Sequence, residues 1–263
     1  TFCQNDAHLF VTPEQIESEF KSVVDLILEV YKELNITDYH FELSLRDPAD
    51  KVKYHPDDQM WDSAENTLRQ VLDDIGIDYV EKVGEAAFYG PKLDVQVRPA
   101  VGNEYTLSTC QLDFCLPMKF NLSYIDKDGN KKTPVVLHRA ILGSIDRFIA
   151  YYLEETKGIL PTWLAPVQVK ILPISEAHRE YAEKVKQELE DNDIRVELDE
   201  RDEKIGYKIR EATMQKVPYM LILGDKEIEA NAVGVRSRKE GDIGQMPTQE
   251  FINKIHEETK SFK

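Results

Sequence analysis

The alternation of hydrophobic and polar positions divides the chain into two parts with different patterns. In the first part, apolar residues recur at helical spacing over 12–35 and 63–75, and a last helix is predicted over 139–156. Between these helices, stretches such as 93–97 and 107–116 alternate in the manner of half-buried strands. Helices that flank a run of antiparallel strands predict an α+β domain.

The pattern changes after a short connector bracketed by Pro161 and Pro166. The strands predicted beyond it are 167–172, 194–198, 219–223 and 233–236. The helices predicted among and after them are 176–190, 205–216 and 248–259. This order predicts a mixed sheet covered by helices. We therefore expect one domain at 1–160 and a second, of α/β type, at 161–263.

The composition is that of a soluble globular protein, with 41% hydrophobic and 31% charged residues. No apolar run approaches the roughly 18 residues needed to span a membrane, and we see no signal-peptide pattern at the start. The three cysteines, Cys3, Cys110 and Cys115, include no CxxC pair. This usage fits a reducing compartment, so we expect a cytoplasmic protein with no membrane partner.

The net charge of -16 argues at first sight against a nucleic-acid partner. The excess of acid is concentrated in the predicted first domain. In the second, Lys204 precedes the predicted helix 205–216, and Lys208, Arg210 and Lys216 recur along it. Such a run is compatible with a solvated face or with contacts to RNA.

Candidate chemistry begins around the predicted helix 139–156, where Gly143 and Ser144 are poor helix formers. Glycine allows a ligand to approach the backbone, and the guanidinium of Arg147 is suited to phosphate or a nucleobase. An ordinary amphipathic helix with a surface arginine explains the same spacing. A lone histidine such as His138 is usually only hydrogen-bonded.

The segment 134–148, PVVLHRAILGSIDRF, resembles the third signature motif of class II aminoacyl-tRNA synthetases, in the form found in the threonyl-tRNA synthetase family. Five more stretches are similar to that family in the same order: QNDAHLF (4–10), AFYGPK (87–92) with Asp94, QLDF (111–114), PTWLAP (161–166) and DEKIGYKIR (202–210). The resemblance covers essentially the whole chain.

The resemblance implies an α+β class II core with an antiparallel sheet, lacking its first part, then an α/β anticodon-binding domain with a mixed five-stranded sheet. It implies a threonine–tRNA ligase, which uses ATP with Mg²⁺ to make threonyl-adenylate and passes threonine to the 3′ end of threonine tRNA. The intact family forms homodimers. With its beginning missing, the chain alone is expected to be inactive.

For the catalytic domain, the resemblance implies a Zn²⁺ ion held by one cysteine and two histidines, the latter matching His8 and His138. The family's cysteine lies upstream, and Cys3 is not at its position. Three protein ligands leave zinc open positions, which the amino group and hydroxyl of threonine can fill. The other threonine-binding positions match Gln4, Asp6, Tyr89 and Gln111.

For the nucleotide, the resemblance implies catalytic cations at Lys92, beside the α-phosphate, and at Arg147. The ATP-binding positions match Phe2, Gln111, Ser144 and Arg147, with adenine between the phenyl ring and the guanidinium. Taken alone, the Tyr89-Gly90-Pro91 stretch reads as a plain turn.

The anticodon-reading positions of the family match Asp202, Arg210, Lys216, Glu227 and Arg236. Two alternatives remain: a non-catalytic synthetase-like paralogue that binds RNA, and a sister enzyme for proline, glycine or histidine. The retained His8, Lys92, His138 and Arg147 disfavour the first alternative. The pairing of the two histidines disfavours the second.

Overall fold

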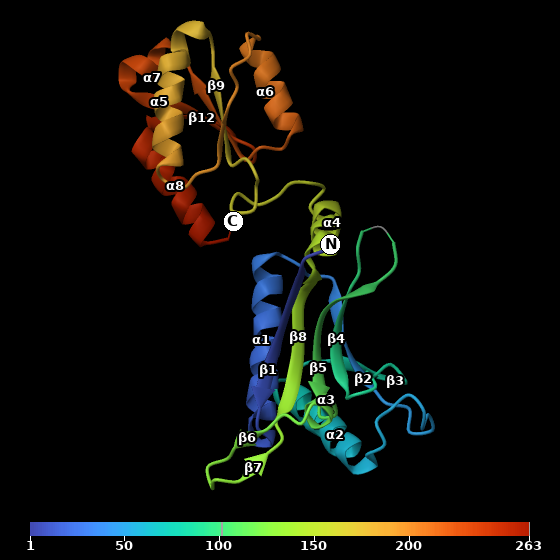
Figure 1. Cartoon of the computed structure of the whole chain (residues 1–263). Helices are drawn as coiled ribbons and strands as arrows, with labels where there is room; N and C mark the ends of the chain where they lie inside the picture. The colour runs from blue at the N-terminus through green and yellow to red at the C-terminus, as the bar shows by residue number, and fades with distance from the viewer. Residues whose placement is uncertain (101, 263) are drawn as a thin grey trace. The chain divides into compact units, whose positions relative to one another are not determined.

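The computed structural model describes residues 1–100 and 102–262 and divides into two compact units, Thr1–Glu155 and Thr156–Lys263 (Figure 1). The domain boundary between residues 160 and 161 remains a prediction. Across the described residues, no helix has the length and apolar character needed to cross a bilayer.

The first unit is built on a six-stranded sheet in the order β1-β8-β5-β4-β2-β3. Neighbouring strands are antiparallel except for the parallel pair β2–β3. The strand bounds are β1 Gln4–Val11, β2 Tyr39–Leu45, β3 Tyr79–Val83, β4 Lys92–Val97, β5 Tyr105–Asp113 and β8 Val135–Ser144. The expected α+β core with a mainly antiparallel sheet is confirmed.

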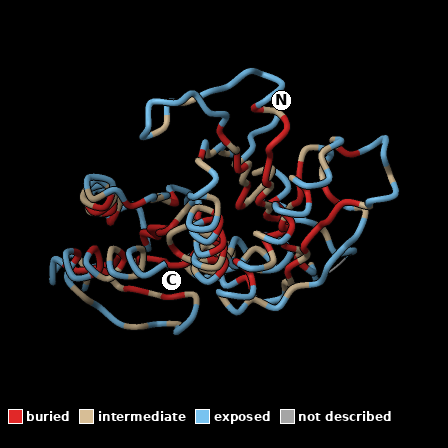
Figure 2. The backbone as a smooth tube through the Cα atoms, turned by 90° about the horizontal axis from the view of Figure 1, so that it is seen from below, coloured by how far each residue is buried: buried red, intermediate tan, exposed pale blue. Residues whose placement is uncertain are grey.

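Two long helices, α1 (Ile16–Glu33) and α2 (Asp58–Asp74), bury their apolar faces in this unit. The hydroxyl of Tyr31 on α1 lies 2.7 Å from that of Ser108 on β5, so α1 covers the face of the sheet on which Ser108 lies. Figure 2 shows the buried parts of the backbone in red. The shorter elements are η1 (Pro13–Gln15), α3 (Leu116–Lys119), β6 (Tyr124–Ile125), β7 (Lys131–Lys132) and α4 (Ile145–Glu155).

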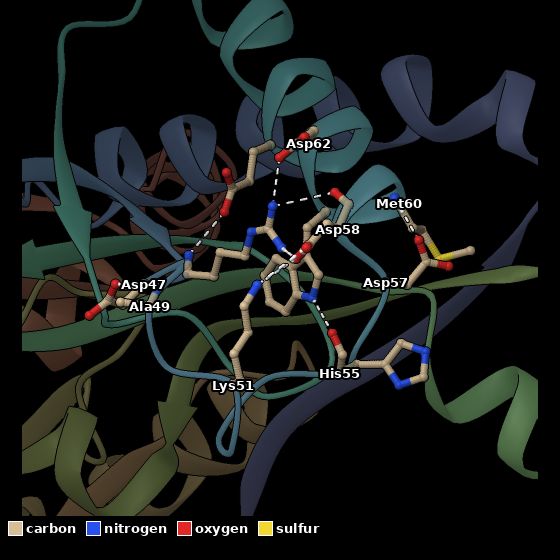
Figure 3. A network of polar contacts seen from close by, with 11 residues as sticks. Asp47, Ala49, Lys51, His55, Asp57, Asp58, Met60 and Asp62 are labelled. Atoms are coloured by element: carbon tan, nitrogen blue, oxygen red, sulfur yellow. Dashed lines mark hydrogen bonds and ion pairs between the residues drawn. The ribbon is translucent and has the colours of Figure 1, made fainter.

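Helix α2 begins earlier than the apolar pattern predicts, because polar groups hold its first turn. The side chain of Asp57 accepts a hydrogen bond from Met60 N at 3.0 Å, which is an N-cap contact. The buried guanidinium of Arg46 pairs with Asp58 and, at 2.6 Å, with Asp62 (Figure 3). Apolar spacing does not reveal such contacts, so the predicted start was several residues late.

The predicted helix 139–156 is wrong in its first part. Residues 139–144 continue strand β8, and helix α4 begins at Ile145. Arg139 pairs with Ala7 of β1 on one side and with Cys110 of β5 on the other. Two ladders of backbone hydrogen bonds override the helical spacing. Gly143 has a φ of 59°, in the left-handed region, and pairs with Asn5 beside an irregularity in β1.

The second unit contains a five-stranded sheet in the order β10-β9-β11-β12-β13. Strands β10, β9 and β11 are parallel, whereas β12 and β13 are antiparallel additions. The bounds are β9 Val169–Pro173, β10 Val196–Leu198, β11 Tyr219–Leu223, β12 Ala232–Ser237 and β13 Gly241–Pro247. The mixed five-stranded sheet is confirmed, although the sequence pattern missed β13.

The two faces of this sheet are covered unequally. The helices are η2 (Glu176–His178), α5 (Arg179–Glu190), α6 (Ile205–Met214), α7 (Asp225–Ala230) and α8 (Thr248–Lys260). Apolar residues of α5 and α8 form the main core on one face. On the other face α6 packs on Leu172 and Met220. Gly234 and Arg236 lie opposite Ile222 and Met220, on this α6 side, and are only partly buried.

Candidate active site and nucleic-acid interface

One row of polar residues crosses five strands of the first sheet. In order they are His8, His138, Gln111, Lys92 and Ser44, each directly opposite the next. Residues directly opposite one another project from the same face of a sheet. Strand register therefore brings together five segments that are distant in sequence, on the face opposite the one covered by α1.

The ammonium group of Lys92 is held in this row by Asp94. The two groups form an ion pair, and Lys92 Nζ also lies 3.5 Å from Ser44 Oγ. Asp94 is only 4% exposed, and its carboxylate accepts hydrogen bonds from Ser44 and Thr109, both at 2.9 Å. A buried carboxylate with three partners therefore positions a cation for an anionic ligand.

The loop between β3 and β4 places Tyr89 over the same row. The Tyr89 hydroxyl donates to Gln111 Oε1, and its ring centroid lies 5.4 Å from that of His138. Burial raises the pKa of Tyr89, and the Asp113 and Asp6 carboxylates add to the shift. The phenol therefore stays protonated near neutral pH. The turn at Gly90 also positions a side chain of the site.

The two predicted zinc ligands lie side by side. The rings of His8 and His138 are 4.7 Å apart and perpendicular. His138 Nε2 lies 2.9 Å from Asp113 Oδ2, and a carboxylate partner of this kind orients a metal-binding histidine. Over 1–100 and 102–262, no group of three or more His, Cys, Asp or Glu side chains is arranged to hold a metal ion.

The predicted adenine-binding pair lies apart from this row along the sheet. The Arg147 guanidinium lies 4.1 Å from the ring centroid of Tyr105, a stacking contact that the sequence analysis missed. Burial raises the pKa of Tyr105 to about 12. Phe2 is 71% exposed, and no ring or cation contact joins it to Arg147 in the part of the chain that the structure describes.

The remaining predicted residues of this site lie along β1 and at the end of β8. Gln4, Asp6 and His8 are all exposed and occupy alternate positions of β1, and Ser144 is opposite Gln4. Asp94 and Asp113 matter to the site as the partners of Lys92 and His138. Both residues belong to motif stretches, but the sequence carries no sign that they are buried.

In the second unit, the open face is the α6 side of β12 and β13, defined by Gly234, Arg236 and Gln245. Gln245 is directly opposite Gly234, and Arg236 is opposite Met220. Arg210 is exposed on α6. Within the described residues, neither Arg210 nor Arg236 has a hydrogen-bond or ion-pair partner. Two unpaired guanidinium groups on one unit are suited to an anionic or base-bearing ligand.

The other predicted anticodon residues differ in their surroundings. Asp202 is exposed in the loop before α6. Glu227, in the first turn of α7, accepts hydrogen bonds from Gly224 N and Gln245 Nε2. Lys216 follows α6 with a φ of 59°, and its ammonium donates to Lys157 O.

Lys208 does not lie on the surface that the predicted basic run implied. The side chain is 3% exposed, and its ammonium donates to the carbonyl oxygens of Pro173 and Asp199, both at 3.2 Å. It joins the end of β9 to the loop that follows β10. Helical spacing shows which residues share a helix, but not which charged side chain is drawn inward by backbone carbonyls.

Comparison with known proteins gives two family matches. Residues 1–156 match the tRNA synthetase class II core domain (G, H, P, S and T). Residues 168–258 match the anticodon binding domain.

Similar proteins include the threonine–tRNA ligase of Geobacillus sp. (strain WCH70), 56% identical over 97% of this chain and 40% of the relative. The ligase of Geobacillus kaustophilus is 58% identical over 94% of this chain and 38% of the relative. The chain thus spans about two fifths of the length of these relatives.

Among solved structures, the RNA binding domain of threonyl-tRNA synthetase from Cryptosporidium parvum is 39% identical, with a TM-score of 0.89, over 97% of this chain and 64% of that one. A prolyl-tRNA synthetase from the same organism, at 18% identity and a TM-score of 0.63 over 98% of this chain and 50% of that one, shares the fold. Because the core-domain match covers more than half of the chain, the chain belongs to the class II tRNA synthetases, and its second unit carries their anticodon-binding domain.

Proposed function

We propose that the chain acts within a threonine–tRNA ligase, with threonine and ATP bound on the polar row and the tRNA anticodon bound on the second unit. The observation that carries the proposal is the polar row itself. Two histidines, the side-chain amide of Gln111 and the ammonium of Lys92 lie on one face of the sheet. The threonine relatives, at 56–58% identity, favour this reading over a prolyl enzyme.

In the proposed reaction, a carboxylate oxygen of threonine attacks the α-phosphorus of ATP, which enters with Mg²⁺, and pyrophosphate leaves. Lys92 would face the charge that develops on the phosphoryl oxygens, and fixed cations stabilise such charge without reorganisation. Asp94 keeps the ammonium on the row until the phosphate arrives. A terminal ribose hydroxyl of the tRNA then attacks the threonyl carbonyl, and AMP leaves.

His8 and His138 fit two of the three protein ligands of the zinc site that the family resemblance implies. His8 and His138 are adjacent, and with Nε2 of His138 facing Asp113 its Nδ1 is the nitrogen left for a metal. Zinc, when bound, supplies a Lewis acid for the amino group and hydroxyl of threonine, which valine cannot match in full. Tyr89 and Gln111 would line the pocket beside it.

Because two imidazoles form an incomplete site, we expect this chain to bind zinc weakly. After dialysis against a mild chelator, metal analysis of the purified 263-residue chain should find far less than one zinc per chain. The variants His8→Ala and Cys3→Ala are the matched pair. Stoichiometric zinc that survives dialysis and is lost in both His8→Ala and Cys3→Ala would show that Cys3 completes the site.

For the tRNA, we propose that Arg210, Arg236 and Glu227 contact anticodon bases and that Asp202 and Lys216 make further contacts. Guanidinium and carboxylate groups bind the edges of splayed loop bases. A carboxylate only accepts hydrogen bonds, so Glu227 would read a base edge that offers N–H groups. The unpaired state of both arginines supports their assignment.

Arg210→Ala should weaken binding of a threonine anticodon stem-loop by about 1–3 kcal/mol and reduce discrimination against a changed anticodon. The control is Arg179→Ala, because Arg179 is partly exposed but already paired with Glu200 at 2.8 Å. Titrations at one salt concentration would compare two stem-loops that differ only in the anticodon. Equal affinity for both, unaltered by Arg210→Ala, would rule out the assignment.

The proposal also includes a homodimer and a cytoplasmic location for the intact protein. Cys3, Cys110 and Cys115 are all free, which supports a reducing compartment. Sedimentation of the intact protein tests the dimer directly.

A further inference from the structure

The carboxylate of Glu227 is held at both oxygens by uncharged N–H donors. Oε2 accepts from the backbone N–H of Gly224 at 2.9 Å, and Oε1 accepts from Gln245 Nε2 at 3.2 Å. The same amide nitrogen also donates to Lys226 O at 3.2 Å, so it is anchored to the turn that carries Glu227. Within the described residues, no lysine or arginine pairs with this carboxylate.

Two glycines leave the space in which the carboxylate lies. A Cβ atom on Gly224 would be 3.3 Å from Glu227 Oε2, and one on Gly234 would be 3.4 Å from Oε1. The latter would also lie 2.9 Å from Ile222 O. We call this space the glycine slot. Gly224 at the start of α7, Gly234 of β12 and the side chain of Gln245 from β13 surround it. Of these parts, only Gln245 contributes a side-chain donor.

We propose that Gln245 is a positioning residue for anticodon recognition and acts through Glu227. The inference rests on the proposed function, in which Glu227 reads a base. A glutamate side chain loses rotamer freedom when it is fixed, and a group that is already fixed loses less on binding. Because both donors are uncharged, no cation competes with the base for the carboxylate, and its remaining lone pairs stay available.

Gln245 is suited to this role by its place in the sheet. It lies directly opposite Gly234, so its side chain lies on the open face beside the glycine slot. The residue is exposed, so its replacement removes a contact without opening the core.

The test compares Gln245→Ala with Gln249→Ala in the whole chain. Gln249 is a matched control because its amide contacts only Asn253, at 3.2 Å, along α8. The probes are a threonine anticodon stem-loop and three copies, each with one anticodon base replaced. Gln245→Ala should lower discrimination at one base position by about threefold to tenfold. Discrimination at the other positions and the unfolding midpoint should not change.

The conservative variant Glu227→Gln tests the proposed base contact of Glu227 separately from the positioning role of Gln245. If it leaves every discrimination ratio unchanged, the proposed role of Glu227 fails. If it reduces one ratio and Gln245→Ala does not, Glu227 reads a base but the positioning inference is overturned. If Gln245→Ala has its full effect in the Glu227→Gln background, Gln245 contacts RNA by itself, and the inference is again overturned. Loss of the Gln245→Ala effect in that background supports it.

Discussion

Replacement of Gly90 by alanine should unfold the loop that carries Tyr89 and destabilise the first unit by about 3 kcal/mol. The new Cβ would lie 1.7 Å from Leu112 O and 2.8 Å from Leu112 C, which are backbone atoms of β5. Neither atom can move without breaking the strand ladder. The loop must therefore leave β5, and Tyr89 loses its hydrogen bond to Gln111.

The chain's two tryptophans allow a direct measurement. Trp61 is fully buried in the first unit, so a Trp163→Phe background makes Trp61 fluorescence a reporter of that unit alone. The Trp163→Phe chain that keeps Gly90 is the reference. An unchanged urea midpoint for Gly90→Ala would contradict the close packing described here.

Lys208→Met should destabilise the second unit by about 2–3 kcal/mol, since hydrogen bonds from charged groups are the stronger ones. The methionine keeps most of the side-chain volume but leaves the carbonyl groups of Pro173 and Asp199 without their donor. Calorimetry would measure the effect, with the exposed Lys204→Met as the control.

The same variant tests the two interpretations of the basic run. A buried structural lysine predicts lower stability and an unchanged affinity of the folded chain for any stem-loop. A phosphate contact predicts the reverse, with normal stability and a uniform loss of affinity. The second result would show that Lys208 belongs to the RNA-binding surface.

Most of the fold could be predicted from the sequence because local periodicity agrees with the tertiary structure. Strand β11 occupies the predicted residues 219–223, and α8 begins where predicted, at Thr248. Strand β13 was missed because Gly241, Gly244 and Pro247 interrupt its alternation. The end of β8 was missed because its partners in β1 and β5 are distant in sequence.

The candidate site was less accessible to sequence reasoning than the fold. The resemblance gave the identities of His8, Lys92 and Gln111, but not that one row of the sheet holds them. That row depends on the register of four separate strand pairs. The anchors Asp94 and Asp113 likewise owe their importance to burial and to partners elsewhere in the chain.

The polar row also has a consequence for how the sheet selects its pairing. If β5 slipped by one residue, Gln111 would turn towards α1, and the buried Cys110 would take its place on the open side. An equal slip of β4 would carry the ammonium of Lys92 into the apolar layer, away from Ser44, where an unpaired charge is strongly disfavoured. The side chains proposed to serve the substrates therefore also disfavour misaligned sheets. When the strands pair in the correct register, the side chains of the polar row are brought together in the same step.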